Sequence, residues 1–120
     1  MQRNHKELRA WQAAMRLVQQ VYALTATFPK EELFGLSSQM RRAAVSVPSN
    51  IAEGSARNGT KELIHFLSIS TGSLAELDTQ LELTNMLGYS SDIFRIQATL
   101  DETTALTLAL AQSLKNKLKE

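Results

Sequence analysis

The sequence predicts an all-α protein, an antiparallel up-down four-helix bundle that forms a single domain over residues 1–120. Only 5 glycines and 2 prolines interrupt the chain, fewer than a turn-rich β-sandwich or barrel requires. Hydrophobic residues make up 43% and charged residues 21%, which excludes disorder caused by a shortage of apolar residues. Helix-breaking residues occur near Pro29, over 54–59 and at Gly88. The helices are therefore predicted at 6–27, 34–56, 60–87 and 91–117.

The first predicted helix carries apolar residues on two neighbouring faces. One face recurs at spacings of three and four residues: Leu8, Trp11, Met15, Val18 and Tyr22. The next face contains Leu17, Val21 and Leu24. Because this helix is apolar around more than half of its circumference, one packing partner would not cover it. The aromatic residues Trp11 and Tyr22 are interpreted as packing residues rather than as a ligand platform.

The second predicted helix combines three surfaces. Its core face comprises Leu36, Met40, Ala43, Ala44, Val47 and Ile51, and its polar stripe comprises Gln39, Arg42, Ser46, Asn50, Glu53 and Arg57. The third surface, small and mildly apolar, comprises Val45, Pro48, Ala52 and Ala56, and is the expected oligomer interface. Inside a helix Pro48 removes one backbone hydrogen bond, so a kink is expected there rather than a break, with the hydroxyls of Ser46 and Ser49 bonding the freed carbonyls.

The third and fourth predicted helices each carry one apolar seam with a period near 3.5 residues, typical of helices that cross at a shallow angle. The third starts at Thr60, which is suited to cap it, and the fourth opens at Ser91 or Asp92. The third seam is Leu63, Phe66, Ser70, Leu74, Leu77, Leu81 and Thr84. The fourth is Ile93, Ile96, Leu100, Thr103, Thr107, Leu110, Leu114 and Leu118. Small residues over 68–73 predict a close approach to a neighbouring helix.

The sequence lacks the residues and motifs that several classes of catalytic and metal-binding site require. There is no cysteine, which excludes disulfides, thiolate metal ligands and cysteine nucleophiles. The histidines, His5 and His65, have no partners at metal-ligand spacing, and no glycine-rich phosphate loop or nucleophile elbow occurs. We therefore expect no metal, no cofactor and no enzymatic activity. The absence of a long apolar run and of an apolar signal segment favours a cytoplasmic protein without membrane contact.

Charge is unevenly distributed along the chain although the net charge is only +1. Residues 36–61 carry four basic residues against Glu53, a net of +3, whereas residues 62–102 carry seven acids against Arg95, a net of −6. The basic residues are Arg41, Arg42, Arg57 and Lys61. One interpretation is a phosphate-contacting surface that several subunits build together. The other is that the basic helix pairs with an acidic helix, within or between subunits.

The polar stripe also permits two interpretations. Asn50 and Glu53 beside arginines are compatible with a catalytic acid, but an ion pair of Glu53 with Arg57 or Arg42 is the preferred structural alternative. On that interpretation Asn50 bonds the loop after Gly54. The segment 54–59 is interpreted as a helix stop with a left-handed glycine, followed by a turn.

Two stretches resemble a known family. Phe28-Pro29 through Leu36, and then Gln39 through Gly54 with its core Ser46-Val47-Pro48-Ser49-Asn50-Ile51-Ala52-Glu53-Gly54, resemble the signature of bacterial four-helix-bundle proteins. That family is known from reading frames in intervening sequences of 23S ribosomal RNA genes. The segments 66–67 and 72–77 resemble its second motif, and the early Trp11-Gln12 and Val21-Tyr22 fit its first helix. The resemblance covers residues 6–115.

The resemblance implies an up-down bundle that assembles into a ring-like homo-oligomer, expected to be a pentamer. A related branch of the family serves as the accessory protein of diversity-generating retroelements, where a basic ring engages a reverse transcriptase and nucleic acid. The sequence thus predicts a non-enzymatic oligomeric binding module that contacts structured RNA or DNA through a basic surface. A protein-interaction scaffold without nucleic-acid binding is the alternative.

Overall fold

The computed structural model, which describes residues 4–120, is an all-α protein with four long helices and no strand in that part of the chain. They are α1 (Arg9–Thr25), α2 (Leu36–Ala56), α3 (Thr60–Met86) and α4 (Phe94–Lys119), with short 3-10 turns at His5–Glu7 and Lys30–Glu32. The four-helix prediction is therefore confirmed. Residues 1–3 of the predicted domain lie outside the described residues.

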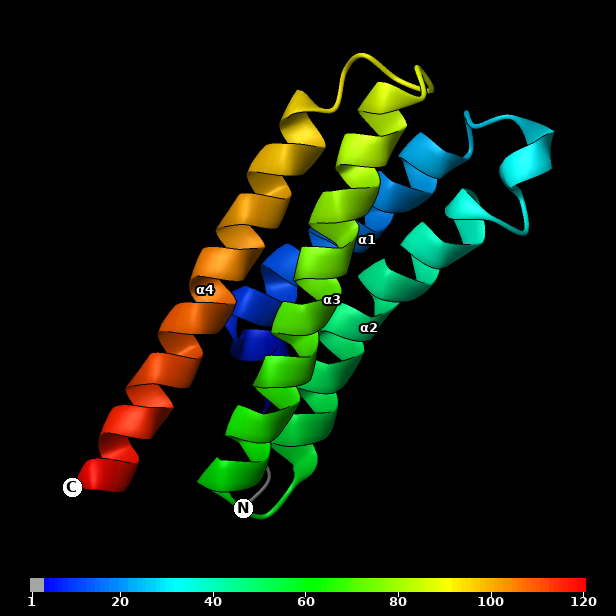
Figure 1. Ribbon diagram of the computed structural model, residues 1–120. Coiled ribbons are helices and arrows are strands. Elements are labelled where there is room, and N and C mark those ends of the chain that lie inside the picture. The colour runs from blue at the N-terminus through cyan, green and yellow to red at the C-terminus, as the bar shows by residue number, and fades with distance from the viewer. Residues whose placement is uncertain (1–3) are drawn as a thin grey trace.

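The helices lie side by side in a rod of 50 × 21 × 19 Å (Figure 1). α2 packs against α1 and α3, and α4 packs against the same two helices. The connections α1–α2 and α3–α4 lie at one end of the rod, and the connection α2–α3 lies at the other end (Figure 1). At the first end the rings of Phe28 and Tyr89, one from each connection, lie 5.3 Å apart.

The helix ends differ from the predicted ends by up to three residues. α1 begins at Arg9 rather than residue 6, because Leu8 is extended and the Asn4 side chain caps a separate 3-10 turn. Gly59 rather than Thr60 precedes the first turn of α3. α4 begins at Phe94 because the hydroxyl of Ser90 accepts a hydrogen bond from the backbone of Asp92, which holds these residues in a local turn.

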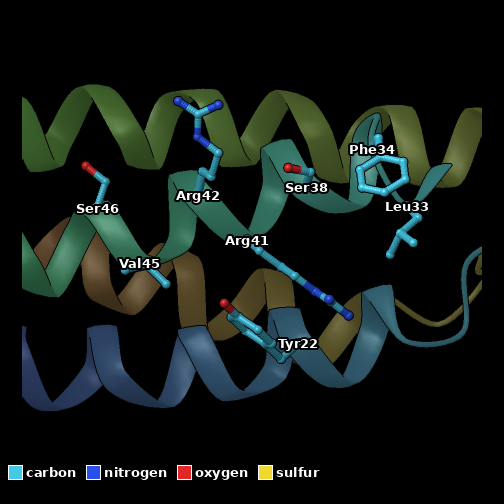
Figure 2. A pocket seen from close by; sticks show the side chains of 8 residues that line it. All are labelled: Tyr22, Leu33, Phe34, Ser38, Arg41, Arg42, Val45 and Ser46. Atoms are coloured by element: carbon cyan, nitrogen blue, oxygen red, sulfur yellow. The ribbon is translucent and has the colours of Figure 1, made fainter.

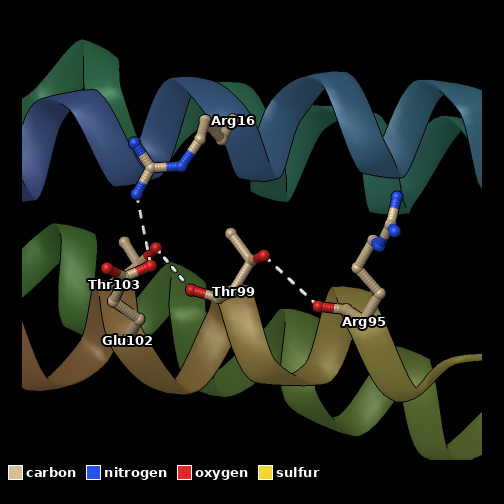
Figure 3. Close-up of polar contacts among 5 residues, drawn as sticks. All are labelled: Arg16, Arg95, Thr99, Glu102 and Thr103. Carbon is tan, nitrogen blue, oxygen red and sulfur yellow. Dashed lines mark hydrogen bonds and ion pairs between the residues drawn. The ribbon is translucent and has the colours of Figure 1, made fainter.

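The core contains most of the residues that the apolar periodicity predicts, but Leu118 of the predicted α4 seam is 48% exposed, and Leu67, outside the predicted α3 seam, is fully buried. The six core positions of α2 are all buried, and so is the α3 seam except for the half-buried Phe66. Thr103 and Thr107 of α4 are fully buried because each hydroxyl donates to the carbonyl four residues earlier, which satisfies it inside the helix. Figure 3 shows this arrangement for Thr99 and Thr103, beside the ion pair of Arg16 with Glu102 that joins α1 to α4.

The face of α1 that points into the core differs from the more regular stripe in the sequence. Its buried residues include Ala10, Ala13 and Ala14 in addition to Leu17 and Val21. Met15 and Tyr22, from the first predicted face, are 42% and 44% exposed. Small alanines face the core because α1 contacts both α2 and α4, and the larger side chains fill the flanks.

α2 is continuous across Pro48 and through Gly54. α2 ends at Ala56, within the predicted stop segment 54–59, but the left-handed glycine expected there is wrong, because Gly88 is the one glycine with a positive φ in residues 4–120. Gly54 is a helical residue, and a glycine suits this position because a Cβ there would come within 2.8 Å of the Phe66 Cβ and 3.0 Å of a Leu63 methyl group. Its small size therefore permits α2 and α3 to approach closely.

This contact predicts opposite effects for two glycine-to-alanine substitutions. In G54A the cost of overpacking, about 1–3 kcal/mol, exceeds the gain in helix propensity of about 0.5–1 kcal/mol, so the free energy of unfolding falls. In G72A the new methyl group meets no atom within 4 Å, so only the propensity gain remains and the free energy of unfolding rises. Denaturant unfolding at one protein concentration measures both. Equal stabilities for the two variants would contradict the close contact at Gly54.

Candidate functional site

The four predicted basic residues form two separate groups. Arg41 and Arg42 lie in the first third of α2, whereas Arg57 follows its last residue and Lys61 lies in the first turn of α3. Fifteen residues of helix separate Arg42 from Arg57, roughly 22 Å at 1.5 Å per residue. One subunit therefore does not gather the four charges into a single patch.

Arg41 is held by two residues of α1 without a carboxylate partner. Its Nε donates to the Thr25 hydroxyl at 2.8 Å, and its guanidinium carbon lies 4.8 Å from the centre of the Tyr22 ring. The Thr25 hydroxyl in turn donates to the Val21 carbonyl at 2.8 Å, which fixes its orientation. Arg41 is half-buried and belongs to no ion pair among residues 4–120. Its charge is thus positioned but not neutralised.

Arg42 points away from Arg41, toward α3 (Figure 2). It is exposed and also forms no ion pair within the described chain. Besides the groove drawn in Figure 2, it borders a second hollow on the α3 side, which Glu76 and Ser73 also line. The adjacent arginines therefore present positive charge on two sides of α2.

Arg57 differs because its charge is compensated within the subunit. Its Nε and Nη2 donate to one oxygen of Glu53, at 3.0 and 2.9 Å, and its guanidinium carbon lies 5.2 Å from the centre of the Phe66 ring. The expected ion pair of Glu53 is therefore confirmed with Arg57. Lys61 is exposed nearby. In the part of the chain that the structure describes, no ion pair joins α2 to α3 or α4.

The polar residues of the signature join α2 to α3. The side-chain nitrogen of Asn50 donates to the carbonyl and the hydroxyl of Ser46, at 2.8 and 2.9 Å, and the Ser73 hydroxyl donates to the same Ser46 hydroxyl at 2.9 Å. The Ser70 hydroxyl donates to the Val47 carbonyl beside Pro48 at 2.9 Å. The prediction that Asn50 bonds the loop after Gly54 is wrong, because Ser46 lies one turn away on the same face.

The predicted oligomer surface of α2 is only partly accessible. Val45 is 40% exposed, Ala56 is exposed and Ala52 is half-buried. Pro48 is buried within the subunit, so its assignment to an outer surface is wrong. The reason is that α2 packs against both α1 and α3, which widens its buried arc beyond one helical face.

A groove beside Arg41 contains residues that the sequence did not indicate as a site. It has a volume of about 640 Å³ and is lined by Tyr22, Leu33, Phe34, Ser38, Arg41, Arg42, Val45 and Ser46 (Figure 2). Phe34 is 92% exposed and Leu33 is 53% exposed. Aromatic rings therefore do lie beside the basic residues, contributed by α1 and by the α1–α2 connection. The sequence feature that could have indicated this groove is the pair Leu33-Phe34, two adjacent large apolar residues that belong to none of the predicted apolar helix faces.

Glu32 fixes the connection that carries Phe34. Its Oε1 accepts a hydrogen bond from the backbone of Leu36 at 3.0 Å, and its Oε2 accepts one from the Tyr89 hydroxyl at 2.6 Å. The Tyr89 hydrogen bond, followed by that of Leu36, lowers the pKa of the Glu32 carboxyl, and Glu32 raises the pKa of the Tyr89 hydroxyl. Both bonds engage Glu32 away from the groove, whose lining includes no carboxylate.

Residues 4–120 contain no group of three or more histidine, aspartate or glutamate side chains placed to hold a metal ion. No helix in that range is long and apolar enough to cross a membrane.

Residues 6–112 match the family described as 23S rRNA-intervening sequence protein. The chain belongs to this family. The match includes both arginines of the groove, the Glu53–Arg57 pair and the Ser46–Asn50 network. The family description refers to an intervening sequence of 23S rRNA and names no activity. A search of curated proteins found no match for this sequence.

The Glu32–Tyr89 bond predicts a change in acid stability. In Y89F the larger cause of the lowered Glu32 pKa is removed, so this pKa rises toward its ordinary value of 4.5. A lowered pKa contributes stability above the ordinary value that is lost as the pH falls through the folded-state pKa. The variant should therefore lose less stability than the wild type over that acid range.

Carboxyl NMR titration of Glu32 and urea unfolding at several pH values measure these two effects. The matched control is Y22F, whose hydroxyl does not bond Glu32 and which should leave the pKa of Glu32 unchanged. An unchanged Glu32 pKa in Y89F would contradict the assignment.

Proposed function

We propose that this family member is a non-enzymatic oligomeric module that binds structured RNA or DNA through phosphate contacts. The observation that supports this most is Arg41, which has no carboxylate partner and lies beside a groove without a carboxylate in its lining, with the adjacent Arg42 directed to the other side of α2 (Figure 2). Arginine suits phosphate because its planar group donates several hydrogen bonds and is weakly hydrated. Lys61 adds charge at the far end of α2, where Arg57 is already engaged by Glu53.

The separation of charge within the subunit supports the same proposal. Residues 36–61 have a net charge of +3, and residues 62–102 have a net charge of −6. Because no ion pair within the described residues joins α2 to α3 or α4, the acidic helices do not neutralise the positive charge of α2 through direct pairs. Repetition of the basic surface in an oligomer raises the number of phosphates contacted and steepens the salt dependence of binding.

Assembly is part of the proposal. In this proposal the subunit is an antiparallel up-down bundle with α2 kinked at Pro48. The family resemblance implies that five subunits form a ring. Large apolar side chains beside the connection α3–α4 are strongly exposed: Met86 at 76% and Leu87 at 53%. Such exposure is typical of a surface that another chain covers.

Light scattering at micromolar concentration should therefore give a mass near five times the subunit mass of 13.3 kDa. A mass of one subunit would contradict assembly. A stable assembly of another size would contradict the ring of five alone.

A protein-interaction scaffold is the second candidate, and the same exposed apolar residues favour it. Apolar contacts tolerate salt, whereas binding through phosphates weakens steeply as salt rises. Retention of native partners at high salt and after nuclease treatment would support the scaffold.

Charge variants test the nucleic-acid proposal. R42E should weaken binding to a hairpin RNA and flatten the slope of log affinity against log salt by about 0.7–0.9 for each phosphate that the variant no longer neutralises. E53Q should strengthen binding, because it frees Arg57 from its carboxylate while the oligomeric mass stays unchanged. Electrophoretic mobility shift assays over a salt series measure both effects.

E82Q serves as the matched control because Glu82 is exposed, forms no ion pair within residues 4–120 and lines neither hollow that contains Arg42. Absence of RNA and DNA retention by the wild type at about 50 mM salt would exclude the proposal.

A further inference from the structure

We infer that the groove between α1 and α2 is a stacking site for an unpaired nucleobase, with Phe34 as the stacking ring and Arg41 as the adjacent phosphate contact. This inference rests on the proposed function and narrows its ligand to single-stranded segments. It is carried by an almost fully exposed aromatic ring, an arginine held in place without a carboxylate, and a groove that contains both.

Phe34 is positioned to stack although almost none of its surface packs against the subunit. It follows the 3-10 turn Lys30–Glu32, and the two hydrogen bonds of Glu32 tie this turn to α2 and to Tyr89. Figure 2 shows the Phe34 ring at one end of the groove, with Leu33 beside it. These bonds fix the backbone of the connection, so binding has to order only the side chain of Phe34.

Arg41 supplies a preorganised charge in the same groove. Thr25 bonds only its Nε, so the two terminal nitrogens have no hydrogen-bond partner on the described chain and can donate to a phosphate. The Tyr22 ring covers one face of the guanidinium, which stabilises its position without neutralising it. An aromatic ring next to a fixed cation is the combination with which proteins bind single strands.

The residues that line the groove also indicate that it does not distinguish one nucleobase from another. Apart from the arginines, its polar side chains are the hydroxyls of Ser38 and Ser46 and the phenol of Tyr22. These few groups cannot read the full hydrogen-bonding edge of a base, so the preference should be for unpaired over paired nucleotides rather than for one base. A base inside a duplex keeps its faces stacked on its neighbours and cannot use Phe34.

The experiment compares a labelled single-stranded RNA of about 12 nucleotides with the same strand annealed to its complement. Fluorescence anisotropy at about 50 mM salt gives both affinities for the full-length oligomer. F34A should lower the affinity for the single strand about tenfold, the effect of losing one stacked base, and leave the duplex affinity unchanged. F34L should behave like F34A, because it keeps an apolar side chain but removes the ring.

The matched control is F94A. Phe94 is 86% exposed and does not line the groove, so its removal should alter neither affinity. R41Q should weaken both ligands, because a phosphate contact serves a single strand and a duplex alike. Circular dichroism and light scattering on each variant report folding and oligomeric mass.

The outcomes separate the two proposals. Equal wild-type affinities for both ligands, with F34A no weaker than F94A, would overturn the stacking site and leave the phosphate-binding proposal intact. Wild-type protein that binds neither ligand would overturn both. A change of oligomeric mass in F34A but not in F94A would overturn the stacking site by making the groove a contact between copies of the chain.

Discussion

The close contact between α2 and α3 is the constraint on which the rest of the molecule depends. Gly54 leaves no room for a Cβ against Phe66, and the hydroxyls of Ser70 and Ser73 bond groups of α2 directly. Where Pro48 removes a backbone donor, the Ser70 bond adds a contact at the neighbouring carbonyl, so α2 stays attached to α3 at the point where it is weakest. With this side of α2 committed to α3, its remaining surface carries the arginines.

The signature residues Ser46 and Asn50 thereby acquire a structural explanation. They lie between Arg42 and the Glu53–Arg57 pair on one stripe, where the sequence alone permits a catalytic interpretation, yet the Asn50 side-chain nitrogen and the Ser46 hydroxyl bond one another, and Ser73 bonds the same hydroxyl. Satisfied polar groups of this kind fix the relative position of two helices, because breaking one bond leaves a partner unpaired. Ser46 and Asn50 are therefore best understood as the part of the stripe that orients α2 against α3, and the proposed ligand-binding residues lie to either side of them.

Periodicity predicted the four helices and most of the core, because residues buried against a neighbouring helix recur at the helical period of 3.6 residues. It missed the alanines of α1 and Leu67 of α3. The left-handed glycine expected in 54–59 is wrong because a glycine near polar residues resembles the end of a helix, whereas Gly54 is small to admit Phe66, which is twelve residues away in the sequence. The basic residues of the site were recognisable from composition, but Arg42 and Arg57 lie on one stripe and are separated by about four turns of helix. The groove became visible only when Phe34 of the connection was placed beside α2. The roles of Gly54, Phe34 and Arg41 depend on residues that are distant in the sequence. The periodicity of a single helix does not reveal such neighbours.

Arg41 and Arg57, near opposite ends of α2, illustrate how the surroundings of an arginine decide its role. Arg57 forms an ion pair with Glu53, one turn away, which neutralises its charge. Arg41 contacts the Thr25 hydroxyl and the Tyr22 ring, which orient its side chain without neutralising it. An exposed ion pair contributes about 0–1 kcal/mol to stability, so releasing Arg57 costs little. An arginine that is oriented but not neutralised is instead ready for an anion, because the entropy of fixing its side chain has already been lost on folding. This difference favours the Arg41 side of α2, rather than the end that holds Arg57, as the surface where a phosphate binds first.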